Sequence, residues 1–216
     1  FPNTVLLIFL IVACYHFGKE DTVFFVNKEI LFKEILYFFK GSSVIIAPLL
    51  FHREETIEIF RALNFNIFEN SLFSDTFLLI FLFLGLISSF FLSHKKDINF
   101  KILLTTDFLS ILIINFFLSP ILAFTIYFCF LHSIRHSITL IFELDKSFKN
   151  GFRKFIKKAI PLTLITSFAF IVAIYLLNNF YELNEAIYKV IFIGLASLTF
   201  PHILLEYLLE KNEKRS

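Results

Sequence analysis

The chain has 216 residues, of which 57% are hydrophobic and only 18% are charged, and its mean hydropathy is +0.79. Soluble domains carry about 25% charged residues, so the composition excludes an ordinary soluble protein and indicates an integral membrane protein. The net charge of +2 is too small to indicate a nucleic-acid partner, and none is expected.

The start of the chain predicts that the sequence is a fragment. Methionine is absent, and residue 1 is a phenylalanine that opens an apolar run. We therefore expect the true N-terminal helix or helices to be missing. No internal repeat or flexible linker divides the rest, so residues 1–216 are predicted to form a single all-α domain, a polytopic transmembrane helical bundle of about six to seven spans.

The first third of the chain alternates apolar runs with charged segments. Residues 4–17 are apolar but fall short of the ~20 residues that a full span needs. Residues 22–40 mix Phe and Leu with Lys and Glu, which predicts an amphipathic helix at the membrane surface, broken at residues 41–43 (Gly-Ser-Ser). The apolar residues 44–51 then lead into a short amphipathic helix that is expected to end near Leu63.

The remaining chain reads as a series of membrane spans, with a polar loop predicted over residues 64–74. The predicted spans cover residues 77–92, 102–118, 121–142, 161–177 and 187–209. Lys and Arg accumulate in residues 94–101, 146–158 and 211–215, which places these segments on the cytoplasmic side. We expect a multi-pass protein of a bacterial-type inner (cell) membrane.

Two histidines stand one helical turn apart inside a predicted span. His132 and His136 project from the same face of a helix and could hold one metal ion. The alternative is a buried polar cluster that joins helices, and the pair alone does not decide between these readings. Arg135 lies between them, and Asp107 comes out at a similar membrane depth. We expect these two to form an ion pair, because an uncompensated charge in the membrane is costly.

Counting along the helices brings four histidines to one depth zone. Measured from the cytoplasmic helix ends, His136 lies at roughly 9 Å, His202 at roughly 10 Å and His132 at roughly 15 Å. His16, at the end of an earlier helix, faces the same side. Imidazole is the usual protein ligand of Fe, Zn and Cu, so convergence of these rings predicts a metal site in the inner half of the membrane.

Four short strings resemble the Brp/Blh family of membrane β-carotene 15,15'-dioxygenases. They are YHFGKED (residues 15–21), FHREE (51–55), YFCFLHSIRH (127–136) and TFPH (199–202), in the order of that family. The resemblance implies a carotenoid dioxygenase that cleaves all-trans-β-carotene with O2 at its central double bond, giving two molecules of retinal. It also implies Fe(2+) as the cofactor, with His16, His132 and His136 as metal ligands, and no catalytic residue beyond these ligands.

The family's other ligand belongs to a His-Gly-x-x-Asp element that these 216 residues lack. We therefore expect three protein ligands here and an inactive fragment. Other polar residues are assigned to the surroundings of the ion. His202, Glu206 and His52 are candidate second-shell or weak ligands, and Glu20 or Asp21 is a candidate carboxylate partner of the His16 ring. The alternative for His202 is a packing or helix-capping role after Pro201.

The implied partners are β-carotene, O2 and the lipid bilayer, with a retinal-binding rhodopsin as a candidate recipient of the product. Two other functions stay open. A CAAX-type intramembrane protease would use the glutamates at positions 54 and 55, although Arg61 is too far from them for that family's EExxxR pattern. A transporter or rhodopsin accessory protein would use the histidines to relay protons. Stoichiometric iron in the purified protein would favour the dioxygenase.

Overall fold

A computed structural model describes residues 2–22, 30, 32–69, 73–93 and 98–213 of the chain. It divides into two compact units, Phe1–Thr139 and Leu140–Ser216, which are described separately below. Over the described ranges the chain is helical and contains no strand, as the sequence predicts. Six helices are long and apolar enough to cross a membrane. The protein is therefore an all-α, multi-pass membrane protein.

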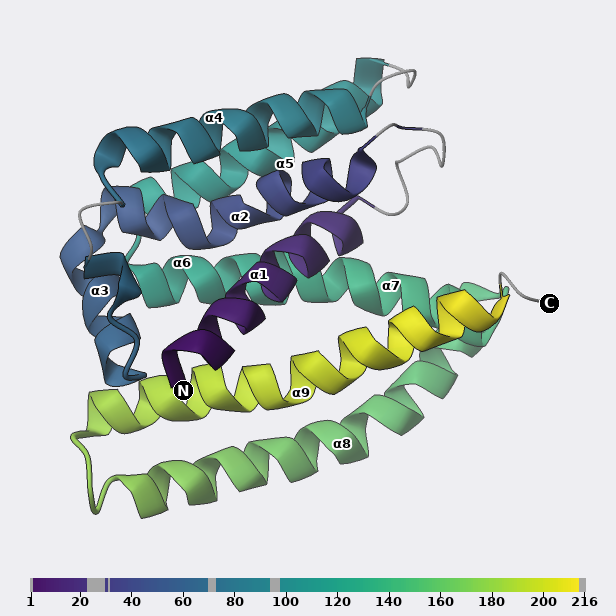
Figure 1. Cartoon of the computed structure of the whole chain (residues 1–216). Helices are drawn as coiled ribbons and strands as arrows, with labels where there is room; N and C mark the ends of the chain where they lie inside the picture. Colours follow the sequence, from purple (N-terminus) through teal and green to yellow (C-terminus); the bar gives the residue numbers. More distant parts are fainter. Residues whose placement is uncertain (1, 23–29, 31, 70–72, 94–97, 214–216) are drawn as a thin grey trace. The chain divides into compact units, whose positions relative to one another are not determined.

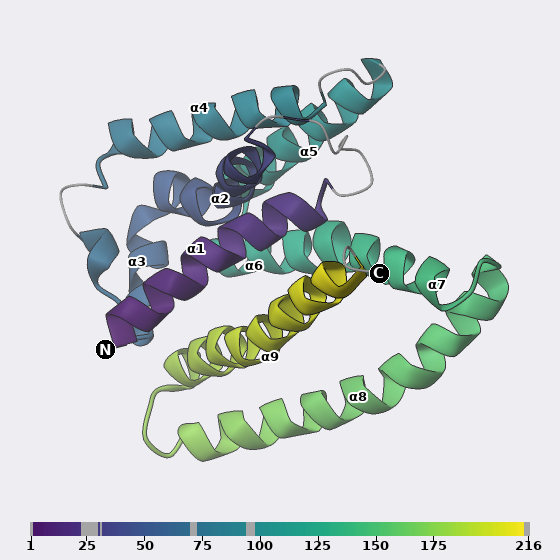
Figure 2. The ribbon, with the colours of Figure 1, turned by 45° about the vertical axis from the view of Figure 1, so that its right-hand side comes forward.

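The first unit is built around α2 (Lys33–Phe51), which packs against three other helices (Figures 1 and 2). These neighbours are α1 (Pro2–Glu20), α4 (Asp75–Leu92) and α5 (Ile98–Phe117). In the chain, α2 and α4 are connected by the short α3 (Arg53–Ala62) and a 3₁₀ turn, Ile67–Glu69. Ala47, Leu78 and Phe108 are almost completely enclosed and belong to the apolar core of this unit. Burial on several sides explains why the polar residues Lys40, Ser42 and Ser43 of α2 are enclosed.

The structure corrects the sequence interpretation of residues 22–51. The predicted break at residues 41–43 is wrong, because α2 runs without interruption from Lys33 to Phe51. Residues 33–40 of the predicted surface helix belong to this candidate membrane span, whereas residues 23–29 and 31 lie outside the described residues. Ser42 donates its hydroxyl hydrogen bond to the Phe39 carbonyl, and Ser43 donates to that of Lys40. The serine hydroxyls are thereby satisfied within the helix itself, so they can enter the membrane interior without breaking it.

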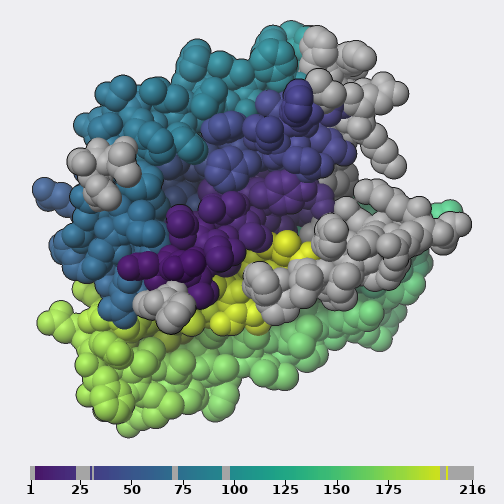
Figure 3. All heavy atoms as spheres, in the orientation of Figure 1, coloured from purple at the N-terminus to yellow at the C-terminus, as the bar shows by residue number. Residues whose placement is uncertain are grey.

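Two glycines allow α1 and α2 to cross in direct backbone contact. A Cβ atom at Gly18 would lie 1.8 Å from the Tyr37 carbonyl oxygen, and one at Gly41 would lie 1.9 Å from that of Cys14. Small residues commonly permit such close approach between membrane helices. The space-filling view shows the side chains of α1 and α2 closed against each other along this crossing (Figure 3). The contact fixes where the C-terminal end of α1 lies beside α2.

The predicted histidine span begins with α6 (Pro120–Ile126), continues through a π-helical segment, η2 (Tyr127–His132), and ends with α7 (Ser133–Leu144). The predicted turn at Ser119 and Pro120 is confirmed, with Ser119 at the N-cap position of α6 and Pro120 as its first residue. Proline suits this position because the first helical N–H has no partner within the helix.

The second unit contains the helical hairpin of α8 (Phe148–Leu177) and α9 (Leu183–Glu213), which lie side by side in Figures 1 and 2. The sequence predicts that the first of these helices begins at Pro161, but α8 already begins at Phe148 and Pro161 lies inside it. Lys and Arg are good helix formers, so the basic segment continues the helix. Lys154 binds Asp145 at 2.6 Å and joins the start of α8 to the preceding turn.

Candidate metal centre

The π-helical segment presents Tyr127 and His132 on one face of the helix. On a regular α-helix of 3.6 residues per turn, side chains five positions apart point about 140° away from each other. A π-helix hydrogen-bonds residue i to residue i+5, which brings Tyr127 and His132 into line. Their ring centroids lie 6.2 Å apart. The local distortion thus gives two polar rings one common direction, and π-helical turns often occur at functional sites.

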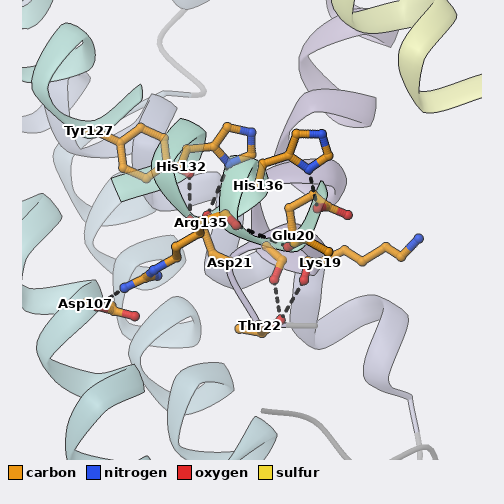
Figure 4. A network of polar contacts seen from close by, with 11 residues as sticks. Lys19, Glu20, Asp21, Thr22, Asp107, Tyr127, His132, Arg135 and His136 are labelled. Atoms are coloured by element: carbon orange, nitrogen blue, oxygen red, sulfur yellow. Dashed lines mark hydrogen bonds and ion pairs between the residues drawn. The ribbon is translucent and has the colours of Figure 1, made fainter. Parts of the chain in front are cut away.

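One carboxylate binds both of these rings. Asp21, directly after α1, accepts a hydrogen bond from the Tyr127 hydroxyl at 2.8 Å, and its other oxygen lies 3.1 Å from His132 Nδ1 (Figure 4). All three residues are buried. Burial by itself raises the pKa of Asp21, but the hydrogen bond and charge of His132, the charge of Lys40 and the Tyr127 hydroxyl together lower it below its usual value. Asp21 is therefore an ionised acceptor that orients His132.

The next histidine is held in the same way by the preceding carboxylate. His136 Nδ1 lies 3.2 Å from Glu20 Oε2, and Glu20 is the last residue of α1 (Figure 4). An imidazole that donates Nδ1–H to a carboxylate keeps its lone pair on Nε2, which is how histidines are commonly oriented toward a metal. The sequence suggests Glu20 or Asp21 as a partner of His16, whereas the structure places them against His136 and His132.

His16 and His132 come together although 116 residues separate them in the chain. Their ring centroids lie 5.4 Å apart, with the Phe17 ring 5.0 Å from His132. Both histidines are buried, with exposed fractions of 4% and 6%. His136, one turn after His132, is half-buried. The structure thus brings the imidazoles of His16 and His132 into direct proximity, and it backs His132 and His136 with carboxylates.

The chemistry of this donor set fits a ferrous ion. Imidazole suits iron, and the carboxylates that contact Nδ1 supply the outer hydrogen bonds that such ligands usually have. Over the described part of the chain, no group of three or more His, Cys, Asp or Glu side chains is placed so that it could hold a metal ion. The ligand roles of His16, His132 and His136 stay predictions.

Arg135 and Asp107, which the sequence pairs by membrane depth, form an ion pair between α7 and α5. Arg135 Nη2 donates to Asp107 Oδ1 at 2.7 Å (Figure 4). Arg135 stands between the two histidines in the sequence and points toward α5, whereas the histidines point toward the end of α1. The pair therefore joins α7 to α5 beside the histidines.

The three remaining candidate residues are His52, His202 and Glu206. His52 follows α2 and is half-buried. It stands 12 residues after Lys40, or about 18 Å along the chain at helical rise. The backbone of α9 includes His202 and Glu206, but their side chains lie outside the described residues. The structure adds two residues that the sequence interpretation does not single out, Tyr127 and Lys40, whose only signal is a polar group inside an apolar run.

Comparisons with known proteins identify the family of the chain. The sequence model of a family described as Beta-carotene 15,15'-dioxygenase matches residues 1–210. A curated relative, the Beta-carotene 15,15'-dioxygenase of uncultured marine bacterium 66A03, is 27% identical over 219 residues, which cover 99% of this chain and 75% of that protein. No solved structure matches the chain.

An all-helical membrane protein with histidines and carboxylates gathered between its spans has the features expected of a protein with a functional site inside the membrane. The match over residues 1–210 goes further, and the chain belongs to the β-carotene 15,15'-dioxygenase family. The resemblance noted in the sequence is thereby confirmed, and carotene cleavage is the activity that this family membership supports.

Proposed function

We propose that this protein cleaves all-trans-β-carotene at the central 15,15' double bond with O2, giving two molecules of retinal, at a histidine-bound Fe(2+) inside the membrane. The reaction balances, because the two oxygen atoms of O2 become the two aldehyde oxygens and the central C=C bond breaks. The observation that carries the proposal is the pair of buried imidazoles, His16 and His132, inside a chain of this family.

Each polar residue of the group has a role in this proposal. His16, His132 and His136 would hold Fe(2+), which when bound would activate O2 beside the polyene. Asp21 and Glu20 orient two of these rings through Nδ1, and Tyr127 fixes the Asp21 carboxylate from its other oxygen. Arg135 and Asp107 hold η2 and α7 against α5.

The surroundings suit a hydrocarbon substrate. Phe17 and Phe128 flank His132, with ring centroids 5.0 Å and 5.6 Å away. A carotenoid is comparable in length to the ~30 Å hydrocarbon core of a bilayer, and it dissolves there rather than in water. An enzyme that places its histidines between membrane helices meets this substrate where it is most concentrated. Retinal could then pass through the lipid to a rhodopsin.

Expression of the full-length protein in β-carotene-producing cells tests the proposal. We expect bleaching of the cells and a retinal peak from the parent protein. His132→Ala and His136→Ala should abolish both signals while the protein still accumulates in the membrane. His94→Ala is the control, because the sequence places that residue in a charged loop beside two lysines.

Iron content separates this function from proton relay. The purified parent protein should hold about one Fe(2+) per chain, as expected for a single histidine site. Retinal formation by both histidine variants at the parent level would remove the proposed ligand roles. A folded, iron-free protein that produces no retinal would instead favour the relay.

A further inference from the structure

A buried lysine lies beside the histidine group and has no role in the proposed function. Lys40, in α2, is 3% exposed, and its Nζ atom finds no hydrogen-bond partner among the residues that the structure describes. Lysine is almost never fully buried unless it is paired, and a charge inside a membrane marks a functional position by default. We therefore expect Lys40 to interact with an acidic group nearby.

The chain around Lys40 shows which groups it meets. Its neighbour Gly41 lies at the close crossing of α1 and α2, against Gly18 of α1. Gly18 is three residues before Asp21. On its other side α2 packs against α5, the helix that carries Asp107. The charged groups that act electrostatically on Lys40 are Asp21, Asp107 and Arg135.

Asp107 has a matching unused atom. One of its oxygens, Oδ1, accepts from Arg135, but the buried Oδ2 has no hydrogen-bond partner in the described part of the chain. Adjacent helices thus present a buried cation without an acceptor and a buried carboxylate oxygen without a donor. The charge of Lys40 therefore adds to that of Arg135 in offsetting the two carboxylates, Asp21 and Asp107.

We propose that Lys40 is a positioning residue that joins the two polar clusters of the first unit, Asp21 with Tyr127 and His132, and Asp107 with Arg135. Its ammonium group balances the two carboxylates and keeps the end of α1 and the middle of α5 at fixed places against α2. Asp21 can then orient His132 only if Lys40 is present. The part of this proposal that concerns iron rests on the proposed function.

A double-mutant cycle tests the link without any metal. Lys40→Met removes the charge at similar length, Asp107→Asn removes the opposite charge, and the third variant carries both changes. If the two groups compensate each other, the thermal midpoint of the double variant in detergent should be no lower than that of the less stable single variant. Additive losses would overturn the proposed link, because independent sites add.

Iron binding tests the positioning role, because the direction of the affinity change in Lys40→Met distinguishes positioning from simple charge repulsion. The positive charge of Lys40 repels a cation, so a purely electrostatic effect predicts tighter Fe(2+) binding in Lys40→Met. Loss of positioning predicts weaker binding, by about 10-fold to 100-fold, as for other outer-shell partners. Binding would be measured with Fe(2+) under anaerobic conditions in competition with a chelator. Equal or tighter binding in folded Lys40→Met would overturn the proposal.

Two further variants complete the test. Lys40→Arg keeps the charge and should restore most of the lost affinity, whereas failure of this rescue would contradict a charge-based role. Lys189→Met is the matched control, because Lys189 is also buried but pairs with Glu185 in the second unit. It should leave Fe(2+) binding unchanged. If the parent protein binds no Fe(2+), the proposed function fails, while the double-mutant cycle still decides the role of Lys40.

Discussion

The contact between α1 and α2 at Gly41 gives the sharpest prediction about the fold. A Cβ atom at this position would lie 1.9 Å from the Cys14 carbonyl oxygen and 2.5 Å from the Gly18 nitrogen. Ordinary contact begins at 3.4 Å. In Gly41→Ala the helices must therefore separate by 3.4 − 1.9 = 1.5 Å. Both obstructing atoms belong to the backbone, so no side-chain rotation can relieve the clash.

The separation would reach the histidine group. Asp21 directly follows α1, and its contacts with Tyr127 and His132 measure 2.8 Å and 3.1 Å. A shift of this size would stretch both beyond hydrogen-bonding distance. Overpacking usually costs about 1–3 kcal/mol, whereas Gly→Ala in a helix otherwise gains roughly 0.5–1 kcal/mol. We expect Gly41→Ala to be destabilised despite its better helix propensity.

Thermal unfolding of the purified protein in detergent measures this effect. Gly194→Ala in α9 is the matched control, since the nearest atoms to its new Cβ belong to the ring of Phe170, which can turn away. The midpoint of Gly41→Ala should fall well below that of the control. A midpoint for Gly41→Ala equal to or above that of the parent would refute the backbone contact.

Three more predictions address separate features. Arg135→Met removes the hydrogen-bonded cation from Asp107 and should cost about 1.5–3 kcal/mol, as for other hydrogen bonds between charged groups. Arg135→Met with Asp107→Leu should recover part of the lost midpoint, and an equal or larger loss in the double variant would contradict the pairing. Deleting Cys129 should convert η2 to an α-helix, in which Tyr127 and His132 are four residues apart and still on one face. We therefore expect a folded variant with an unchanged helical circular dichroism signal. Aggregation of this variant would argue against the π-helical geometry. The hydrogen bond from Lys154 lowers the pKa of Asp145. The stabilisation of this turn is therefore present above the ordinary carboxyl pKa and is lost as the pH falls through the lowered pKa. The hydrogen-exchange rate of the turn should rise over that pH range in the parent protein but show no such step in Asp145→Asn.

The sequence determined the class of the protein and much of its local structure. Long apolar runs require helices in a membrane, because backbone groups in lipid must be satisfied within the segment. Accordingly, the predicted spans at residues 77–92 and 102–118 correspond to α4 and α5 within a few residues. The short helix before Leu63 is α3, and the four short motifs predicted the family that the comparison over residues 1–210 shows.

Pattern reasoning failed where a packing contact overrides local preference. Glycine and two serines inside α2 look like a helix break, yet Gly41 is there to admit α1, and the serine hydroxyls bind carbonyls one turn back. The charged residues before Pro161 look like a loop but extend α8. In both places the local sequence resembles a helix end. The helix continues nevertheless, because packing against another helix or the helix propensity of the residues outweighs the local signal.

The partners of the buried polar groups are a matter of tertiary structure alone. Histidine spacing identified His132 and His136, and depth identified the pairing of Arg135 with Asp107. Neither spacing nor depth can show that Asp21 binds Tyr127 and His132 together, because that contact requires a π-helical turn and an α1 crossing set by glycine. Contacts between residues more than 100 positions apart depend on how helices approach each other, and a linear pattern carries no measure of that distance.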